Sequence, residues 1–89
     1  MAMMHQSGEH VINRLKRAGG HLNKVIRMIE HGDPCIAAAQ QLHAVVRALE
    51  KAKHVFVQDH IDHCLGEETL AKRPAKDILA ELKEVAKYI

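Results

Sequence analysis

Hydrophobic residues recur with a helical period along most of the chain. In the first third, apolar positions alternate at spacings of four and three, at Val11, Leu15, Ala18, Leu22, Val25 and Ile29. This heptad-like spacing predicts one helix with a single apolar face, ending near Gly32 and Asp33. The Gly19–Gly20 pair inside that helix costs about 1 kcal/mol per glycine relative to alanine. We therefore expect another backbone to approach the helix closely there.

A second and longer helix is predicted to start at Asp33–Pro34, a capping residue followed by proline at the first helical position. Apolar positions continue at Ile36, Ala39, Leu42, Val46, Leu49, Ala52 and Phe56, and neither glycine nor proline interrupts them before Gly66. Such a helix has about thirty residues and a length of roughly 45 Å. The short neighbours available in the same chain cannot cover it, so we expect a partner chain.

A polar connection over residues 66–74 separates the long helix from a short third one, which the apolar positions Ile78, Leu82, Val85 and Ile89 predict. Because no segment alternates as a strand does, the predicted fold class is all-α, a three-helix protomer in one domain spanning residues 1–89. Aromatic residues make up only 2% of the chain. So small a core rarely supplies more than about 3–5 kcal/mol without a staple, a metal or a partner.

The net charge of +2 is modest, but its distribution is uneven. Between positions 13 and 27 the chain carries five basic residues and no acidic one: Arg14, Lys16, Arg17, Lys24 and Arg27. Arg14, Arg17 and Lys24 share a helical stripe with His21, which is typical of a phosphate-binding surface but also of an ordinary polar face. Arg47 and Lys51 extend this candidate phosphate-binding surface.

The start of the chain contains no secretory signal, and no segment is long and apolar enough to span a membrane. We therefore expect a cytoplasmic protein whose thiols are reduced. In that setting a pair of cysteines indicates metal or redox chemistry rather than a structural disulfide.

His60 and Cys64 lie four residues apart, so one helix face presents an imidazole and a thiol together. Cys35 lies near the other end of the same predicted helix, about 43 Å away along a straight rod. Two long helices packed antiparallel would bring Cys35 of one chain beside His60 and Cys64 of another, and two-fold symmetry would do so twice. The alternative is that Cys35 is a small apolar residue and the histidine-rich segment a solvated face.

Two segments, "NRLKRAGGHLNKVIRMIE" and "QQLHAVVRALEKAKHVFVQDHIDHCL", with a cysteine between them, resemble the CsoR/RcnR family of metal-responsive repressors. The resemblance covers roughly residues 11–88. It implies protomers that dimerise through antiparallel long helices, pair into a flat tetramer and bind operator DNA through basic faces. It also implies that metal binding releases the DNA and derepresses an efflux operon.

By position, the family's metal ligands correspond to Cys35, His60 and Cys64. Its copper sensors also use a tyrosine before the first cysteine and a glutamate on the third helix. Glu81 matches the glutamate, but Pro34 stands in the tyrosine's place. The nickel and cobalt sensors often recruit an N-terminal histidine, for which His5 is available and His10 is a weaker choice.

The expected function is therefore repression relieved by Ni(II) or Co(II), with Cu(I) as the alternative, and the expected partners are operator DNA and further copies of the chain. A thiol- or persulfide-responsive repressor that uses Cys35 and Cys64 is one alternative, and a helical metal chaperone that never binds DNA is another. Enzymatic activity is not expected, because no nucleophile motif with an orienting group is present. His60 argues against the persulfide-sensing branch of the family, and Cys64 against the formaldehyde-sensing branch.

Overall fold

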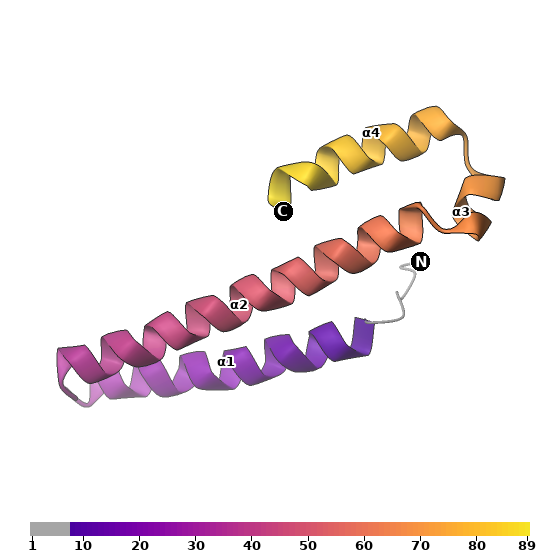
Figure 1. Ribbon diagram of the computed structural model, residues 1–89. Coiled ribbons are helices and arrows are strands. Elements are labelled where there is room, and N and C mark those ends of the chain that lie inside the picture. The colour runs from indigo at the N-terminus through magenta and orange to yellow at the C-terminus, as the bar shows by residue number, and fades with distance from the viewer. Residues whose placement is uncertain (1–7) are drawn as a thin grey trace. The chain divides into compact units, whose positions relative to one another are not determined.

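The computed structural model describes residues 8–89, which form helices and contain no strand (Figure 1). The elements are α1 (Gly8–Glu30), α2 (Cys35–Cys64), α3 (Glu67–Lys72), α4 (Ala75–Val85) and a final 3-10 turn, η1 (Ala86–Tyr88). The all-α prediction is confirmed, and the second helix has the expected thirty residues. The chain divides into two compact units, Glu9–Ala52 and a second that contains Lys53–Ile89; α2 contributes to both.

The turn between α1 and α2 is formed by Gly32, whose φ of 71° suits a residue without a Cβ. The Gly32 N–H donates to the Ile29 carbonyl at 3.2 Å, and the Asp33 N–H donates to the Met28 carbonyl at 2.9 Å. This pair of bonds is a Schellman motif, which satisfies carbonyls at the end of a helix. The predicted end of the first helix at Gly32 and Asp33 is thus confirmed.

The first unit is an antiparallel pair formed by α1 and the first part of α2 (Figure 1). Its core contains three buried residues from each helix, each set spaced seven apart: Val11, Ala18 and Val25 of α1 and Ala38, Val45 and Ala52 of α2. The antiparallel register places a valine of one helix level with an alanine of the other in every layer. Alternation of large and small side chains lets the two helices pack closely.

Much of each predicted apolar face nevertheless stays exposed in the single chain. Leu15 and Leu22 of α1 are 45% and 37% exposed, and Leu42 and Val46 of α2 are 42% and 44% exposed. The reason is geometric, since one neighbouring helix covers only part of a face that is wider than a single row of residues. Exposed apolar surface of this extent is typical of interaction sites.

The glycine pair in α1 does not make the close approach expected of it within the chain. Apart from the chain neighbours and the surrounding backbone of α1, no described atom lies within 4 Å of the position that a Cβ would take at Gly19 or Gly20. Neither glycine is therefore required by the packing of α1 against α2.

In the second unit, the last part of α2 is followed by α3, and α4 runs back along α2 (Figure 1). The short helix α3 lies in the segment that was expected to be a plain polar connection. Its six residues are too few to show an apolar period, but Glu67 and Glu68 in its first turn and Lys72 in its last suit the helix dipole. Val57 and Cys64 of α2 and Ile78 of α4 are the buried residues in the described part of this unit. No described helix is long and apolar enough to cross a membrane.

Candidate metal centre

His60 and Cys64 occupy the last turns of α2, where their four-residue spacing puts both side chains on one face. The Cys64 Sγ lies 3.5 Å from the His60 Nε2. Cys64 is only 1% exposed, whereas the imidazole of His60 is half-buried. The helix alone therefore presents a nitrogen and a sulfur donor side by side, as the sequence predicted.

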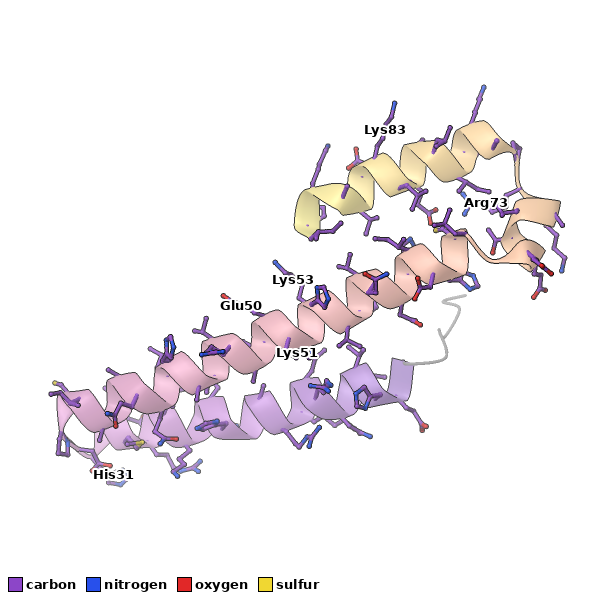
Figure 2. All side chains as sticks on the ribbon, viewed as in Figure 1. His31, Glu50, Lys51, Lys53, Arg73 and Lys83 are labelled. Atoms are coloured by element: carbon purple, nitrogen blue, oxygen red, sulfur yellow. The ribbon has the colours of Figure 1, made fainter. Side chains whose placement is uncertain are left out.

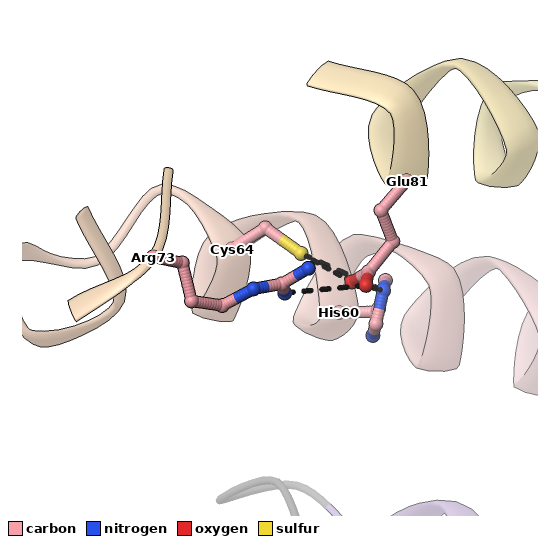
Figure 3. A network of polar contacts seen from close by, with 4 residues as sticks. All are labelled: His60, Cys64, Arg73 and Glu81. Atoms are coloured by element: carbon pink, nitrogen blue, oxygen red, sulfur yellow. Dashed lines mark hydrogen bonds and ion pairs between the residues drawn. The ribbon is translucent and has the colours of Figure 1, made fainter. Parts of the chain in front are cut away.

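Helix α4 brings a third donor, the Glu81 carboxylate, to the same place (Figure 3). The Cys64 thiol donates to the Glu81 Oε2 at 3.0 Å, and the His60 Nε2 lies 2.7 Å from the same oxygen. Because a carboxylate only accepts hydrogen bonds, the His60 Nε2 carries the proton in this contact. One oxygen of Glu81 therefore contacts both donors of α2.

The fourth member of this network is Arg73, which sequence reasoning missed. Its guanidinium donates from Nη1 to the Glu81 Oε1 at 3.2 Å (Figure 3). Arg73 follows α3 and precedes Pro74, and eight positions separate it from Glu81. Apolar periodicity carries no information about such a contact. The only available signal was an arginine placed before the proline that starts a helix bearing a carboxylate.

The environment of the centre shifts the pKa values of Cys64 and Glu81 in opposite directions. Burial, followed by the hydrogen bond to Glu81 and its negative charge, raises the pKa of Cys64 to about 11. The hydrogen bond from Cys64 lowers the pKa of Glu81, and the hydrogen bond and charge of Arg73 add to the lowering. At neutral pH the centre thus contains a neutral thiol and an ionised carboxylate.

The ligand atoms of His60, Cys64 and Glu81 all lie within 4.8 Å of one another, so one metal ion could contact all three. A nitrogen, a sulfur and an oxygen donor suit a borderline transition metal. Cys35 is not part of this group: it is exposed, begins α2 and belongs to the other unit. His5 lies outside the described residues.

The residues predicted to contact DNA lie in the first unit. Arg14, Arg17 and His21 line a shallow pocket of about 290 Å³ together with Ala18 and Ala48. This pocket places two guanidinium groups and an imidazole around one concave surface, which a phosphate could enter.

Other contacts hold parts of this basic surface in place. The Arg14 Nε donates to the His10 Nε2 at 2.8 Å, and His21 bonds the Gln41 Oε1 at 2.6 Å. The remaining candidates, Lys24, Arg47 and Lys51, are exposed.

The chain is thus all-helical, with a candidate metal centre formed by a cysteine, a histidine and a glutamate in one unit and a basic surface in the other. A family model described as "Metal-sensitive transcriptional repressor" matches residues 7–89. The chain belongs to this family of metal-sensitive transcriptional repressors. Its members are repressors and not enzymes, in agreement with the expectation from the sequence.

Individual relatives respond to different metals. The chain is 36% identical over 77 residues to the copper-sensing transcriptional repressor CsoR of Mycobacterium ulcerans, a match that covers 86% of this chain and 65% of that protein. The match to the CsoR of Mycobacterium tuberculosis is 36% over 55 residues and covers 46% of that protein. Among solved structures, the nickel-responsive transcriptional regulator InrS aligns with a TM-score of 0.78 and 30% identity, over 98% of this chain and 97% of that one.

Proposed function

We propose that the chain represses transcription by binding operator DNA in its metal-free form and releases the DNA when Ni(II) or Co(II) binds, with Cu(I) as the alternative effector. The observation that carries this proposal is the convergence of His60, Cys64 and Glu81 in a chain of this repressor family. Derepression of a metal efflux operon would follow from the release.

The choice of metal rests on the donor set. Cu(I) prefers soft sulfur ligands and needs few of them, whereas Ni(II) and Co(II) accept mixed nitrogen, sulfur and oxygen donors. The Glu81 oxygen close to Cys64 and His60 therefore favours a divalent ion. Pro34, in place of the tyrosine used by the copper sensors, and the nitrogen that His5 could add point the same way.

Cys35 completes the proposed site from a second copy of the chain. A thiol at the first residue of a 30-residue helix suits ligation to the last turn of an antiparallel partner helix. The exposed apolar side chains of the first unit supply the surface for such pairing, among them Leu42, Val46 and Leu49. Two such dimers would form the proposed tetramer.

The state of Cys64 explains how metal uptake is linked to protons. Because the pKa of Cys64 is raised to about 11, the residue is a thiol at neutral pH and donates to Glu81. Ligation requires the thiolate, so metal uptake must release this proton. A reactive, redox-sensing cysteine normally has a lowered pKa and good solvent access. The burial of Cys64 therefore supports metal sensing over the thiol-responsive alternative.

The first test of this proposal is an anaerobic titration of the reduced protein with Ni(II), Co(II) and Cu(I), followed by absorption spectroscopy. We expect thiolate-to-metal charge transfer at one metal per subunit for Ni(II) and Co(II). His5→Ala should weaken Ni(II) binding and leave Cu(I) binding nearly unchanged. Release of DNA by Cu(I) alone, at free-metal levels matched to affinity, would assign the protein to copper instead.

The shared site has its own test. Chains carrying Cys35→Ala and chains carrying Cys64→Ala are unfolded together and refolded as mixed assemblies. A mixed dimer retains one intact site if the site lies between subunits, whereas each variant alone retains none. Metal binding by the wild type without any by the mixed assembly would show that the cysteines do not meet across the interface.

A further inference from the structure

We propose that Arg73 is a positioning residue of the metal centre: it fixes the Glu81 carboxylate over His60 and Cys64 and thereby sets the metal affinity. This inference rests on the proposed function, because it assigns a role in metal binding. The assignment of Arg73 comes from its contacts in the folded chain.

The first step in the argument is that the two oxygens of Glu81 have different partners. Arg73 donates to Oε1 at 3.2 Å, while Oε2 contacts the Cys64 thiol at 3.0 Å and the His60 Nε2 at 2.7 Å. A carboxylate held at one oxygen cannot rotate about its last bonds without breaking that contact. The Arg73 bond therefore determines where the other oxygen points.

The second step is that the backbone of Arg73 is itself fixed. Its N–H donates to the Thr69 carbonyl at 3.0 Å and closes the end of α3. Its φ of −120° and ψ of 143° are the extended values that the following Pro74 imposes on the residue before it. The Pro74 carbonyl in turn accepts the Ile78 N–H at 3.2 Å and starts α4. The arginine is thus anchored between two helices whose ends it joins.

The third step concerns charge. The side chains of Arg73 and Glu81 are 39% and 34% exposed, so water only partly screens their attraction. A ligating carboxylate is oriented by the hydrogen bond to its other oxygen, which Arg73 supplies to Glu81, and removal of such a supporting partner typically costs about 10–100-fold in metal affinity.

The neighbouring lysine provides a matched control. Lys72 is also basic and adjacent in sequence, but its Nζ donates to Glu68 at 2.9 Å, an exposed pair away from Glu81. Figure 2 shows Arg73 at the junction of α3 and α4, whereas Lys83 extends from the side of α4 that faces away from α2. Lys72→Gln therefore changes the net charge by the same amount as Arg73→Gln but removes no contact of the metal centre.

The test measures Ni(II) affinity by chelator competition for the reduced wild type, Arg73→Gln, Glu81→Gln, the double variant and Lys72→Gln. Arg73→Gln should weaken binding about 10-fold and Lys72→Gln should leave it unchanged. The double variant should bind no more weakly than Glu81→Gln, because Arg73 acts through Glu81. Arg73→Lys should restore part of the affinity.

A metal-free measurement accompanies this series. In NMR spectra, the guanidinium protons of Arg73 should exchange with water more slowly than those of Arg17, and Glu81→Gln should remove the difference. Additive effects in the double variant, equal effects of Lys72→Gln and Arg73→Gln, or unchanged affinity in Arg73→Gln would each overturn the inference. Failure of the wild type to bind any metal would instead reject the proposed function, and the inference with it.

Discussion

The two units of the chain are both helical but differ in their charge and in the packing of their side chains. The hairpin Glu9–Ala52 carries seven basic and four acidic residues, and its core is a regular stack of valine and alanine. The segment Lys53–Ile89 carries six basic and seven acidic residues and contains the polar network around Cys64. An electropositive, repetitive surface suits phosphate contacts, and an irregular junction of three helices suits a metal. We therefore expect the proposed DNA binding and the proposed metal binding to be separable by mutation.

The largest effect expected from that separation is on metal binding by Cys64→Ala. Removal of the buried sulfur eliminates a ligand, so the affinity should fall more than about 100-fold, beyond the range for residues that only support ligands. The affinity for operator DNA without metal should stay within a factor of about three, because Cys64 and the basic residues belong to different units. Such a factor corresponds to less than about 1 kcal/mol. Chelator competition and fluorescence anisotropy measure the two quantities. A variant that loses both metal binding and DNA binding would contradict the assignment of these two activities to different units.

The second prediction concerns the ionisation of Cys64 in the metal-free Cys35→Ala protein, in which it is the single thiol. Its thiolate should form with a midpoint near pH 11, well above the ordinary pKa of 9.0, as followed by ultraviolet absorbance. Because the folded state holds the proton more tightly, the free energy of unfolding should be unaffected below pH 9.0 and decrease as the pH rises toward 11. Glu81→Gln should lower the midpoint, since it removes the negative charge beside the thiol.

The third prediction concerns the core of the hairpin. Val45 is 1% exposed, so Val45→Ala should destabilise the protein by about 1–3 kcal/mol in chemical denaturation. The exposed neighbour Glu50, labelled in Figure 2, provides the control, and Glu50→Ala should change the stability by less than about 0.5 kcal/mol. Equal effects of the two substitutions would show that Val45 does not lie in the core.

The smallest predicted effect concerns the basic surface. Arg17→Ala should weaken binding to operator and to random DNA alike, because phosphate contacts position a protein without reading bases. The slope of log K against log salt should decrease by about 0.9 for each phosphate that the variant no longer neutralises. Metal affinity should not change. A weaker operator complex with an unchanged slope would show that Arg17 reads bases instead.

The two units also differ in how far the sequence predicted them. The two helices of the hairpin and the turn between them were predicted, because the heptad period, Asp33–Pro34 and Gly32 are local signals, but their antiparallel pairing within one chain was not. In α1 the sequence did not reveal which part of the apolar face is buried, since Leu15 and Ala18 share one stripe and only the neighbouring helix separates them. In α2 the predicted face was largely wrong, because the buried Ala38 and Val45 lie outside it. That depends on packing, which periodicity does not describe.

The candidate centre was predicted in part. The pairing of His60 with Cys64 follows from helix geometry alone, whereas Glu81 came from family resemblance and Arg73 was missed. Both Glu81 and Arg73 lie beyond α3, a helix too short to show a pattern. Their approach to Cys64 depends on the turn at Arg73 and Pro74, and the hydrophobic periodicity of the sequence does not predict that turn.

The most direct test of the central claim, that metal at the His60–Cys64 centre controls DNA binding by the hairpin, is a titration of the operator complex with buffered Ni(II). Fluorescence anisotropy of labelled DNA and charge-transfer absorbance are recorded on the same reduced, anaerobic sample. We predict that the DNA is released in parallel with metal binding, and that a His60→Ala protein keeps its DNA throughout. Full metal occupancy of the wild type with the DNA still bound would contradict the claim.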